Sequence, residues 1–535
     1  MQTRALALVL AVASLSTANA QKHTRDAEIH DPDTLAWWHT TEALSNDKME
    51  GRDTGSAAYL RAADYVVKRF KAAGLQPAGE AGTYLQTVPM HEVAVDPAIA
   101  SFTILPGLKD VKGAPATPEN KPVPLAFLQE ITVTATPDLY PLTIAPMTFR
   151  GYCGKDAMKE IAGKIVVCFG TQRTGLPTAA ERAANARAGG AQGIVNVDDP
   201  YFTIEPPRWP AAYARSVGVG PAPAKGALGS SMLVMKLSST SFGKLLAGTG
   251  HDPEDLLAEG GAKQPLASFD IPARLQVRMR VTQRTYSSPN IIAALPGSDP
   301  ALKDEYVVIA AHLDGYGYGT PVLGDKLYNG ALDDAAYVAF LIQFADNLKK
   351  EQRPLKRSIL FCVFTGEEKG LLGSNWFVDH PTVPIAKLAA DINLDQLRPL
   401  FPLKLLTASA IDDTTLGVTA RAVGGSMGIA LQPDKEPERG LLRRADNYPF
   451  LRVGVPAISF IFGYEPGTED EKRYREWYQV RYHRPQDDLT QPVDFEAAAK
   501  LNQFLYTLTE AVANKVERPA FVPGSKLAPK IQQER

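Results

Sequence analysis

The sequence has few cysteines. It contains three in 535 residues, which excludes a small scaffold held together by many disulfides. Cys153 and Cys168 are near enough in sequence to close a short loop, and the sequence leaves open whether they are bonded or remain two buried thiols. Cys362 lies in the apolar run 359–364 and is predicted to be a core thiol. None of the three has metal-ligand spacing.

The sequence also lacks an excess of charge of either sign. Lys and Arg total 57 and Asp and Glu total 59, which gives a formal net charge of -2. A chain this close to neutrality has no general field that attracts nucleic acid or an anionic membrane. Recognition of a partner must therefore be local, and no nucleic-acid partner is expected.

Long hydrophobic runs are scarce as well. Residues 5–15 form an apolar run that follows Arg4 and precedes small residues ending at Ala20. This run is too short to span a bilayer, and the whole segment 1–20 is typical of a cleaved export signal. We therefore expect the mature chain to begin at Gln21 and to act in the periplasm or outside the cell. No other stretch is apolar enough to predict a membrane anchor after cleavage.

The length of the chain allows two or three domains. Residues 57–73 have apolar positions at helical spacing and Gly74 ends the pattern, which predicts an amphipathic helix. Residues 97–121 are rich in Pro, Gly and Lys and are predicted to connect to a second unit. That unit has strand-like runs at 164–169 and 193–197 around a helix-like segment at 179–186. It is predicted to be a small α/β insert.

After Pro289 the pattern changes to an alternation of strands and helices, which favours a largely parallel, three-layered α/β sheet. Strands are expected at 306–311, 358–364, 389–394, 403–407 and 456–462, and helices at 334–349, 414–423 and 495–516. Functional sites in such sheets gather at the carboxyl ends of the strands.

Acidic residues and histidines stand where these predicted strands end or where the next helix begins. They are His312, Asp314, Asp333, Asp334, Glu367, Glu368, Asp395 and His483. Carboxylates gathered in one cleft repel each other unless a strong positive charge is present, and divalent metal ions supply it. A mixture of His, Asp and Glu without cysteine suits zinc. The set is large enough for two zinc ions if one carboxylate bridges them.

The motifs around these residues resemble metallopeptidase family 28, the family of the secreted co-catalytic zinc aminopeptidases, which also includes glutamate carboxypeptidases and, more distantly, glutaminyl cyclases. The matching motifs are Ala311-His312-Leu313-Asp314, Gly330-Ala331-Leu332-Asp333-Asp334, Thr365-Gly366-Glu367-Glu368-Lys369-Gly370, Asn393-Leu394-Asp395 and Tyr482-His483, with Gly51-Arg52 upstream. Residues 163–167 and 188–191 look like part of a protease-associated domain.

The resemblance implies a three-layer zinc-peptidase fold, with a central mixed, largely parallel sheet and a small α/β protease-associated domain inserted. It divides the chain into a signal peptide (1–20), the N-terminal part of the peptidase domain (21–114), the insert (115–281), the catalytic zinc peptidase domain (282–520) and a C-terminal tail (521–535). It also implies peptide substrates with a free N-terminus, cleaved at the first peptide bond.

The same resemblance implies a role for each residue of the site. His312 and Asp395 would bind one zinc, Glu368 and His483 the other, and Asp333 would bridge the two. Glu367 would be the general base. Asp314 would accept a hydrogen bond from the free nitrogen of His312, and Asp334 would follow Asp333 through a cis peptide. A tyrosine near His483 would stabilise the oxyanion, and the candidates are Tyr464, Tyr474, Tyr478 and Tyr482.

Two alternatives stay open. A carboxypeptidase or dipeptidase of the same family would need cationic groups, and Arg439, Arg443 and Arg444 are candidates that also fit a solvated charge cluster. They precede Ala445-Asp446-Asn447, where relatives often have Ser-Asp-His. A serine hydrolase would use Ser426, Asp446 and His483, because residues 424–428 match Gly-x-Ser-x-Gly. The expected helix before Ser426 argues against it, because that motif follows a strand.

Overall fold

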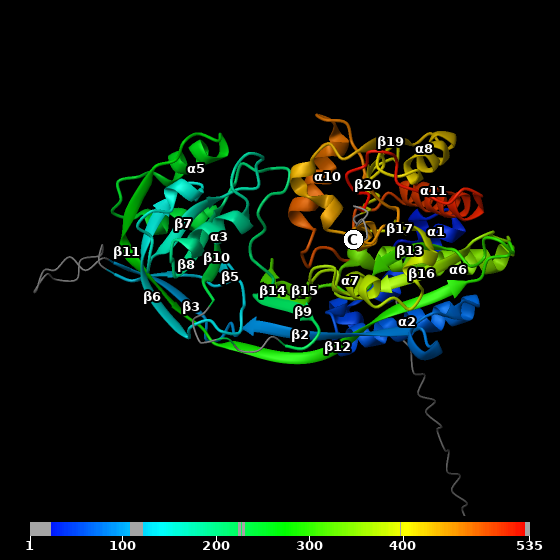
Figure 1. The fold of residues 1–535 in the computed structure, drawn as a ribbon, viewed down its shortest axis with the longest axis horizontal. Helices are drawn as coiled ribbons and strands as arrows, with labels where there is room; N and C mark the ends of the chain where they lie inside the picture. The colour runs from blue at the N-terminus through cyan, green and yellow to red at the C-terminus, as the bar shows by residue number, and fades with distance from the viewer. Residues whose placement is uncertain (1–22, 107–120, 223–225, 227–230, 396, 530–535) are drawn as a thin grey trace, which may run out of the picture.

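The computed structural model describes residues 23–106, 121–222, 226, 231–395 and 397–529. The predicted export signal and its cleavage point lie outside these ranges. Two sheets lie side by side and are joined along one edge of the molecule by the long strands β2 (Leu85–Val95) and β12 (Val281–Leu295) (Figure 1). In the described part of the chain, no helix combines the length and the apolar character that crossing a membrane requires.

The larger sheet is mixed, with parallel strands at its centre. Its order is β19-β18-β20-β17-β13-β16-β12-β2-β9, with β1 pairing beside β12. The parallel centre consists of β16 (Ser358–Phe364), β13 (Tyr306–His312), β17 (Leu388–Asn393) and β20 (Ala457–Phe462). The outer strands are β19 (Ala430–Pro433), β18 (Leu405–Ser409), β9 (Arg215–Val219) and β1 (Gln76–Pro77). The predicted α/β class is confirmed, and the central strands coincide with the predicted apolar runs.

Helices cover both faces of this sheet. One face packs against α1 (Pro32–Ser45), α2 (Ala57–Ala73), α6 (Ala336–Glu351), α8 (Leu416–Ser426) and α11 (Phe495–Asn514). The other face packs against α7 (Leu372–Asp379) and α9 (Asn447–Arg452). Alternate residues of β13 supply the two cores, since Val307 and Ile309 face one set of helices and Val308 faces the other. Cys362 lies in the second core, as predicted.

The predicted helix 57–73 is confirmed at both ends. Ser56 accepts a hydrogen bond from the Tyr59 backbone amide and caps the start of α2. Gly74 has a φ of 85° and ends the helix in the left-handed conformation, which glycine adopts without steric cost.

The smaller sheet has the order β4-β3-β11-β6-β7-β8-β10-β5 and its own buried core. Its strands are β4 (Val123–Leu125), β3 (Ser101–Pro106), β11 (Ser268–Arg278), β6 (Leu142–Arg150), β7 (Ile165–Gly170), β8 (Gly193–Asp198), β10 (Leu233–Leu237) and β5 (Ile131–Val133). Its helices are α3 (Ala179–Ala188), α4 (Phe242–Leu246) and α5 (Pro253–Gly261). A disulfide joins Cys153 and Cys168, which settles the question that the sequence left open.

One prediction for this region was wrong. Residues 97–121 were expected to be a connection, but β3 pairs with β11 and belongs to the smaller sheet. Phe102 and Ile104 of β3 are buried in the core of that sheet. The strand is six residues long, so its alternation was too brief to stand out from the flanking Pro and Gly residues. The smaller sheet therefore takes in residues that precede position 115.

Candidate metal centre

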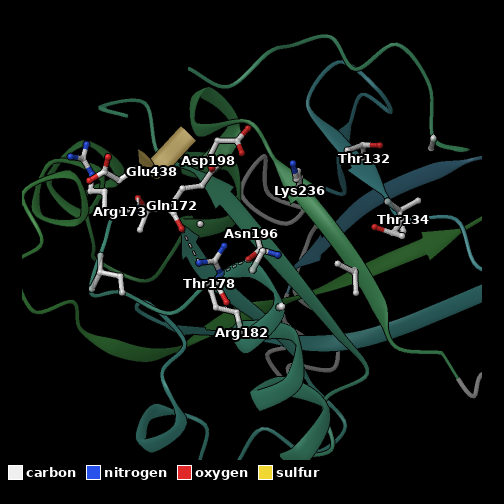
Figure 2. Close-up of a pocket in the computed structure, with 18 of the residues that line it drawn as sticks. Thr132, Thr134, Gln172, Arg173, Thr178, Arg182, Asn196, Asp198, Lys236 and Glu438 are labelled. Atoms are coloured by element: carbon white, nitrogen blue, oxygen red, sulfur yellow. Dashed lines mark hydrogen bonds between the residues drawn. The ribbon is translucent and has the colours of Figure 1, made fainter. Parts of the chain in front are cut away.

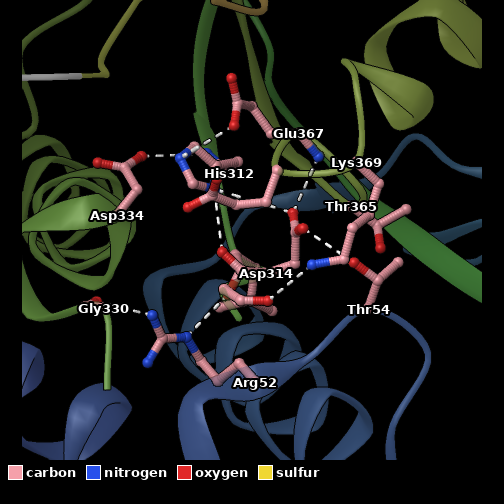
Figure 3. Close-up of polar contacts among 12 residues, drawn as sticks. Arg52, Thr54, His312, Asp314, Gly330, Asp334, Thr365, Glu367 and Lys369 are labelled. Carbon is pink, nitrogen blue, oxygen red and sulfur yellow. Dashed lines mark hydrogen bonds and ion pairs between the residues drawn. The ribbon is translucent and has the colours of Figure 1, made fainter. Parts of the chain in front are cut away.

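The predicted site residues converge at the carboxyl ends of the central parallel strands. His312 is the last residue of β13, Glu367 and Glu368 follow β16, and Asp395 follows β17. Asp333 and Asp334 lie in the turn Ala331–Ala335 that opens α6, and His483 follows α10 (Glu469–Val480). Figure 3 shows His312 between Asp334 and Glu367. The edge predicted from the sequence is the one at which these side chains meet.

The donor atoms form two adjoining groups. Those of His312, Asp334 and Asp395 all lie within 4.8 Å of one another, and so do those of Asp333, Glu368 and His483. The Asp333 carboxylate joins the groups, because its Oδ1 lies 3.3 Å from His312 Nε2 and its Oδ2 lies 3.4 Å from His483 Nε2. Glu368 Oε2 lies 3.2 Å from His483 Nε2.

Burial makes this concentration of carboxylates costly. Asp333 and Asp395 are each 4% exposed, and Asp334 is fully buried. Burial raises the pKa of Asp395 to about 6 and raises the pKa of Glu367 well above its ordinary value, with further raising from Asp395. Among the described residues, Asp395 Oδ1 and Asp334 Oδ1 have no hydrogen-bond partner. Buried oxygens without partners, beside two imidazoles, fit a pair of divalent cations.

Backbone contacts hold this arrangement in place. The peptide bond between Asp333 and Asp334 is cis, as the resemblance implied. The His312 amide donates to Asp334 Oδ2 at 3.1 Å. The Asp487 carboxylate accepts the backbone amides of Leu332 and Asp333 at 2.9 Å and 3.0 Å, and burial raises its pKa to about 7. Asp487 therefore fixes the backbone that carries Asp333.

Asp314 contacts His312 differently from the expectation. The atom that lies 3.1 Å from His312 Nδ1 is the backbone oxygen of Asp314, while its carboxylate is 3.8 Å away. The carboxylate accepts instead from Thr54 Oγ1 at 2.9 Å and from the Glu367 amide at 3.1 Å. Asp314 thus fixes His312 through its carbonyl and positions the Glu367 backbone through its side chain (Figure 3).

Arg52 joins the N-terminal part of the chain to this centre. It is fully buried, and its guanidinium donates to the carbonyl oxygens of Leu313 at 2.8 Å and Gly330 at 2.8 Å (Figure 3). The guanidinium also donates to the carbonyls of Leu44 and Asn329. One side chain therefore fixes the loop after His312 and the loop before Asp333.

The sequence model of peptidase family M28 matches residues 290–509, the stretch that contains His312, Asp333, Glu367, Glu368, Asp395 and His483. This chain carries a peptidase family M28 domain. The resemblance of the metal-site motifs to this family is thereby confirmed.

Proteins of other organisms are similar to this chain in sequence. A "Probable zinc metalloprotease" of Pyrenophora tritici-repentis is 27% identical over 270 residues, which cover 43% of this chain and 58% of that protein. "Aminopeptidase YwaD" of Bacillus subtilis is 23% identical over 367 residues, which cover 68% of this chain and 65% of that protein. The chain thus spans between half and two thirds of the length of these relatives.

Solved structures share the fold over nearly the whole chain. The aminopeptidase from Aneurinibacillus sp. strain AM-1 superimposes with a TM-score of 0.57 at 18% identity, covering 93% of this chain and 96% of that one. A zinc aminopeptidase from Bacillus subtilis gives 0.54 at 17% identity, covering 90% and 95%. The zinc-aminopeptidase fold predicted for the chain is confirmed.

One tyrosine of the M28 domain was missed in the sequence. The hydroxyl of Tyr316 lies 2.9 Å from His483 Nδ1, on the side of the ring opposite the carboxylates. Tyr316 lies 167 positions before His483, so spacing in the sequence gave no signal of this contact. Of the four tyrosines predicted to lie near His483, Tyr482 stacks its ring on His483 at 3.7 Å. The Tyr482 hydroxyl accepts from Arg444.

The Gly-x-Ser-x-Gly segment at 424–428 does not have the geometry of a nucleophile elbow, in agreement with the helix expected before Ser426. Ser426 is the last residue of α8, and its hydroxyl donates to the Val423 carbonyl at 2.7 Å. A nucleophile elbow places the serine between a strand and a following helix. Asp446 is buried and accepts a hydrogen bond from Ser374.

A cavity of about 990 Å³ lies beside the smaller sheet and reaches the M28 domain at Glu438. Its lining includes Arg182, Asn196 and Lys236 from the smaller sheet and Glu438 from the M28 domain (Figure 2). Arg182 is buried and donates to Asn196 Oδ1 at 2.7 Å. The cavity lies at the carboxyl ends of β7, β8 and β10, where α/β sheets form binding crevices.

Proposed function

We propose that this chain is an exported zinc exopeptidase that hydrolyses the N-terminal peptide bond of peptides. The observation that carries the proposal is the Asp333 carboxylate, whose two oxygens face the Nε2 atoms of two different histidines. A carboxylate placed in this way is suited to bridge two metal ions. His312 and Asp395 would complete one zinc site, and Glu368 and His483 the other.

Two bound zinc ions would supply the positive charge that lowers the pKa of a water and polarises the substrate carbonyl. Glu367 would take the proton from that water, a role supported by the position of its Oε2, 3.8 Å from His312 Nε2, and by a side chain that is 10% exposed. The same carboxyl would return the proton to the departing amine. The hydrogen bond from the Glu367 amide to Asp314 holds it beside the metal ligands.

Tyr316 is proposed as a residue that positions His483. If His483 Nε2 held a metal, its Nδ1 would carry a proton and would donate it in a hydrogen bond to the Tyr316 oxygen. The Tyr316 ring packs against Tyr213 at 5.5 Å and against Tyr328 at 5.9 Å. The Tyr213 hydroxyl also accepts a hydrogen bond from Lys369 Nζ at 2.6 Å. These contacts hold the rings of Tyr213, Tyr316 and Tyr328 in place.

The smaller sheet is proposed to be a protease-associated domain that shapes access to the metals. Arg208 stacks on the Tyr482 ring at 4.6 Å, and Arg484 donates to the carbonyls of Trp209 and Pro210 at 2.8 Å and 2.9 Å. The cavity of Figure 2 is lined mainly by the insert and reaches the M28 domain at Glu438. These contacts support a role for the insert in limiting the length of a bound peptide.

The arginines near the site favour an aminopeptidase over a carboxypeptidase. Glu205 of the insert lies 3.4 Å from Arg439 and 3.3 Å from Arg444, and Arg443 is exposed. Guanidinium groups already paired with a carboxylate are poorly suited to bind a second one from a substrate. Export is supported by the disulfide, which is typical of oxidising compartments.

The test combines metal analysis with three forms of one tripeptide: free, N-acetylated and C-amidated. The proposal predicts two zinc ions at the M28 site, cleavage of the free and amidated forms, and no cleavage of the acetylated form. Cleavage of the acetylated form together with loss of activity on the amidated form would instead establish a carboxypeptidase.

A further inference from the structure

A second group of histidines and carboxylates lies at the N-terminal end of the described chain. His39 and Glu42 are three residues apart on α1, which places them on one face of the helix. His23 and Asp26 are also three residues apart, at the start of the short helical turn Asp26–Glu28. Each segment thus offers one imidazole and one carboxylate, a pairing that helices use to bind metals.

The histidine of each segment contacts the carboxylate of the other segment. His23 Nδ1 contacts Glu42 Oε2, and His39 Nε2 lies 2.8 Å from Asp26 Oδ1. The two imidazole rings stack with their centroids 4.0 Å apart and their planes at 25°.

The donor atoms converge as they do at the M28 site. One donor atom from each of His23, His39 and Glu42 lies within 4.8 Å of the other two. Two imidazole nitrogens and a carboxylate oxygen are ligands that zinc prefers. The side chains of His23, His39 and Asp26 are 39%, 34% and 41% exposed, so they are free to close around an ion, while Glu42 is 7% exposed and gives the site a fixed ligand.

We propose that His23, His39 and Glu42, with Asp26 beside them, bind a zinc ion separate from the M28 pair. The ion joins the N-terminal segment to α1. Helix α1 is itself linked to the start of α6, because Trp37 Nε1 donates to the Ala336 carbonyl at 2.6 Å. The N-terminal ion therefore stabilises the fold without contacting the reacting atoms.

The experiment counts zinc in the purified full chain after dialysis against buffered free zinc. The parent chain is expected to hold three ions, and His39→Gln and His23→Gln are each expected to hold two. His30→Gln is the matched control, because His30 is an exposed histidine between the two pairs and outside the cluster; it is expected to hold three. His39→Gln should keep parental peptide turnover and lose part of the zinc-dependent rise in melting temperature.

The outcomes separate this site from the proposed function. Failure of the M28 pair alone would leave one ion, which His39→Gln would remove. Whatever the count in the parent chain, a His39→Gln chain that holds the same number of ions as the parent overturns the N-terminal site and shows that the two histidines only form ion pairs with the carboxylates.

Discussion

Replacing Tyr316 by Phe removes the hydroxyl that lies 2.9 Å from His483 Nδ1 and leaves the ring in place. Mutation of a side chain that hydrogen-bonds a metal-binding histidine typically lowers the metal affinity by about 10–100-fold. An unsatisfied buried donor costs about 1–3 kcal/mol, which at about 1.4 kcal/mol per tenfold covers a similar range. The His483 side chain is 20% exposed, so water can replace part of the lost bond. We therefore expect a loss of zinc affinity at the lower end of this range, about tenfold at one site.

The assay is a competition titration with a zinc chelator, which resolves the weaker of the two M28 sites. Tyr328→Phe is the matched control, because Tyr328 belongs to the same ring cluster but its hydroxyl donates to the Thr320 carbonyl at 2.8 Å. The control should keep parental zinc affinity. Parental affinity in Tyr316→Phe, or an equal loss in Tyr328→Phe, would refute the positioning role of the Tyr316 hydroxyl.

Three further outcomes are expected. Glu368→Ala should lower zinc occupancy by about one ion per chain and reduce the melting temperature, because metal binding also stabilises the fold; unchanged occupancy by metal analysis would exclude Glu368 as a ligand. Replacing Cys153 and Cys168 together by Ser should lower the stability of the smaller sheet by about 3 kcal/mol, the value for a loop of about 15 residues, as measured by urea unfolding. A strong chelator should abolish peptide hydrolysis and added zinc should restore it, whereas Ser426→Ala should keep parental turnover; the reverse pattern would establish a serine hydrolase.

Much of the fold follows from local sequence signals. The strand predicted at 358–364 and the helix predicted at 57–73 have those bounds in the structure, because the strand is a continuous apolar run and the helix has clear caps. Strand β3 was missed because it is stabilised by pairing with β11, more than 150 residues later, rather than by a long pattern of its own. Pairing between distant segments leaves little trace in either one.

Contacts between distant segments could not be predicted at the metal centre either. Its carboxylates and imidazoles were found because most stand at the end of a predicted strand or the start of a predicted helix and lie in motifs of the family, and the structure brings them together. The contact between Tyr316 and His483 joins distant parts of the chain and has no motif. The role of the Asp314 carbonyl escaped for another reason, since a sequence names side chains and does not show which backbone oxygen faces His312.

The central claim is that Glu367 moves a proton while the neighbouring residues hold two zinc ions. Glu367→Gln keeps the size and polarity of the side chain and removes its basicity, so metal content and turnover of one free-amine peptide should be measured on the same preparation. The account predicts two M28 zinc ions, parental substrate affinity and a rate lower by roughly 10²–10⁴-fold. A Glu367→Gln chain that loses zinc from the M28 site, or one that turns over near the parental rate, would contradict it.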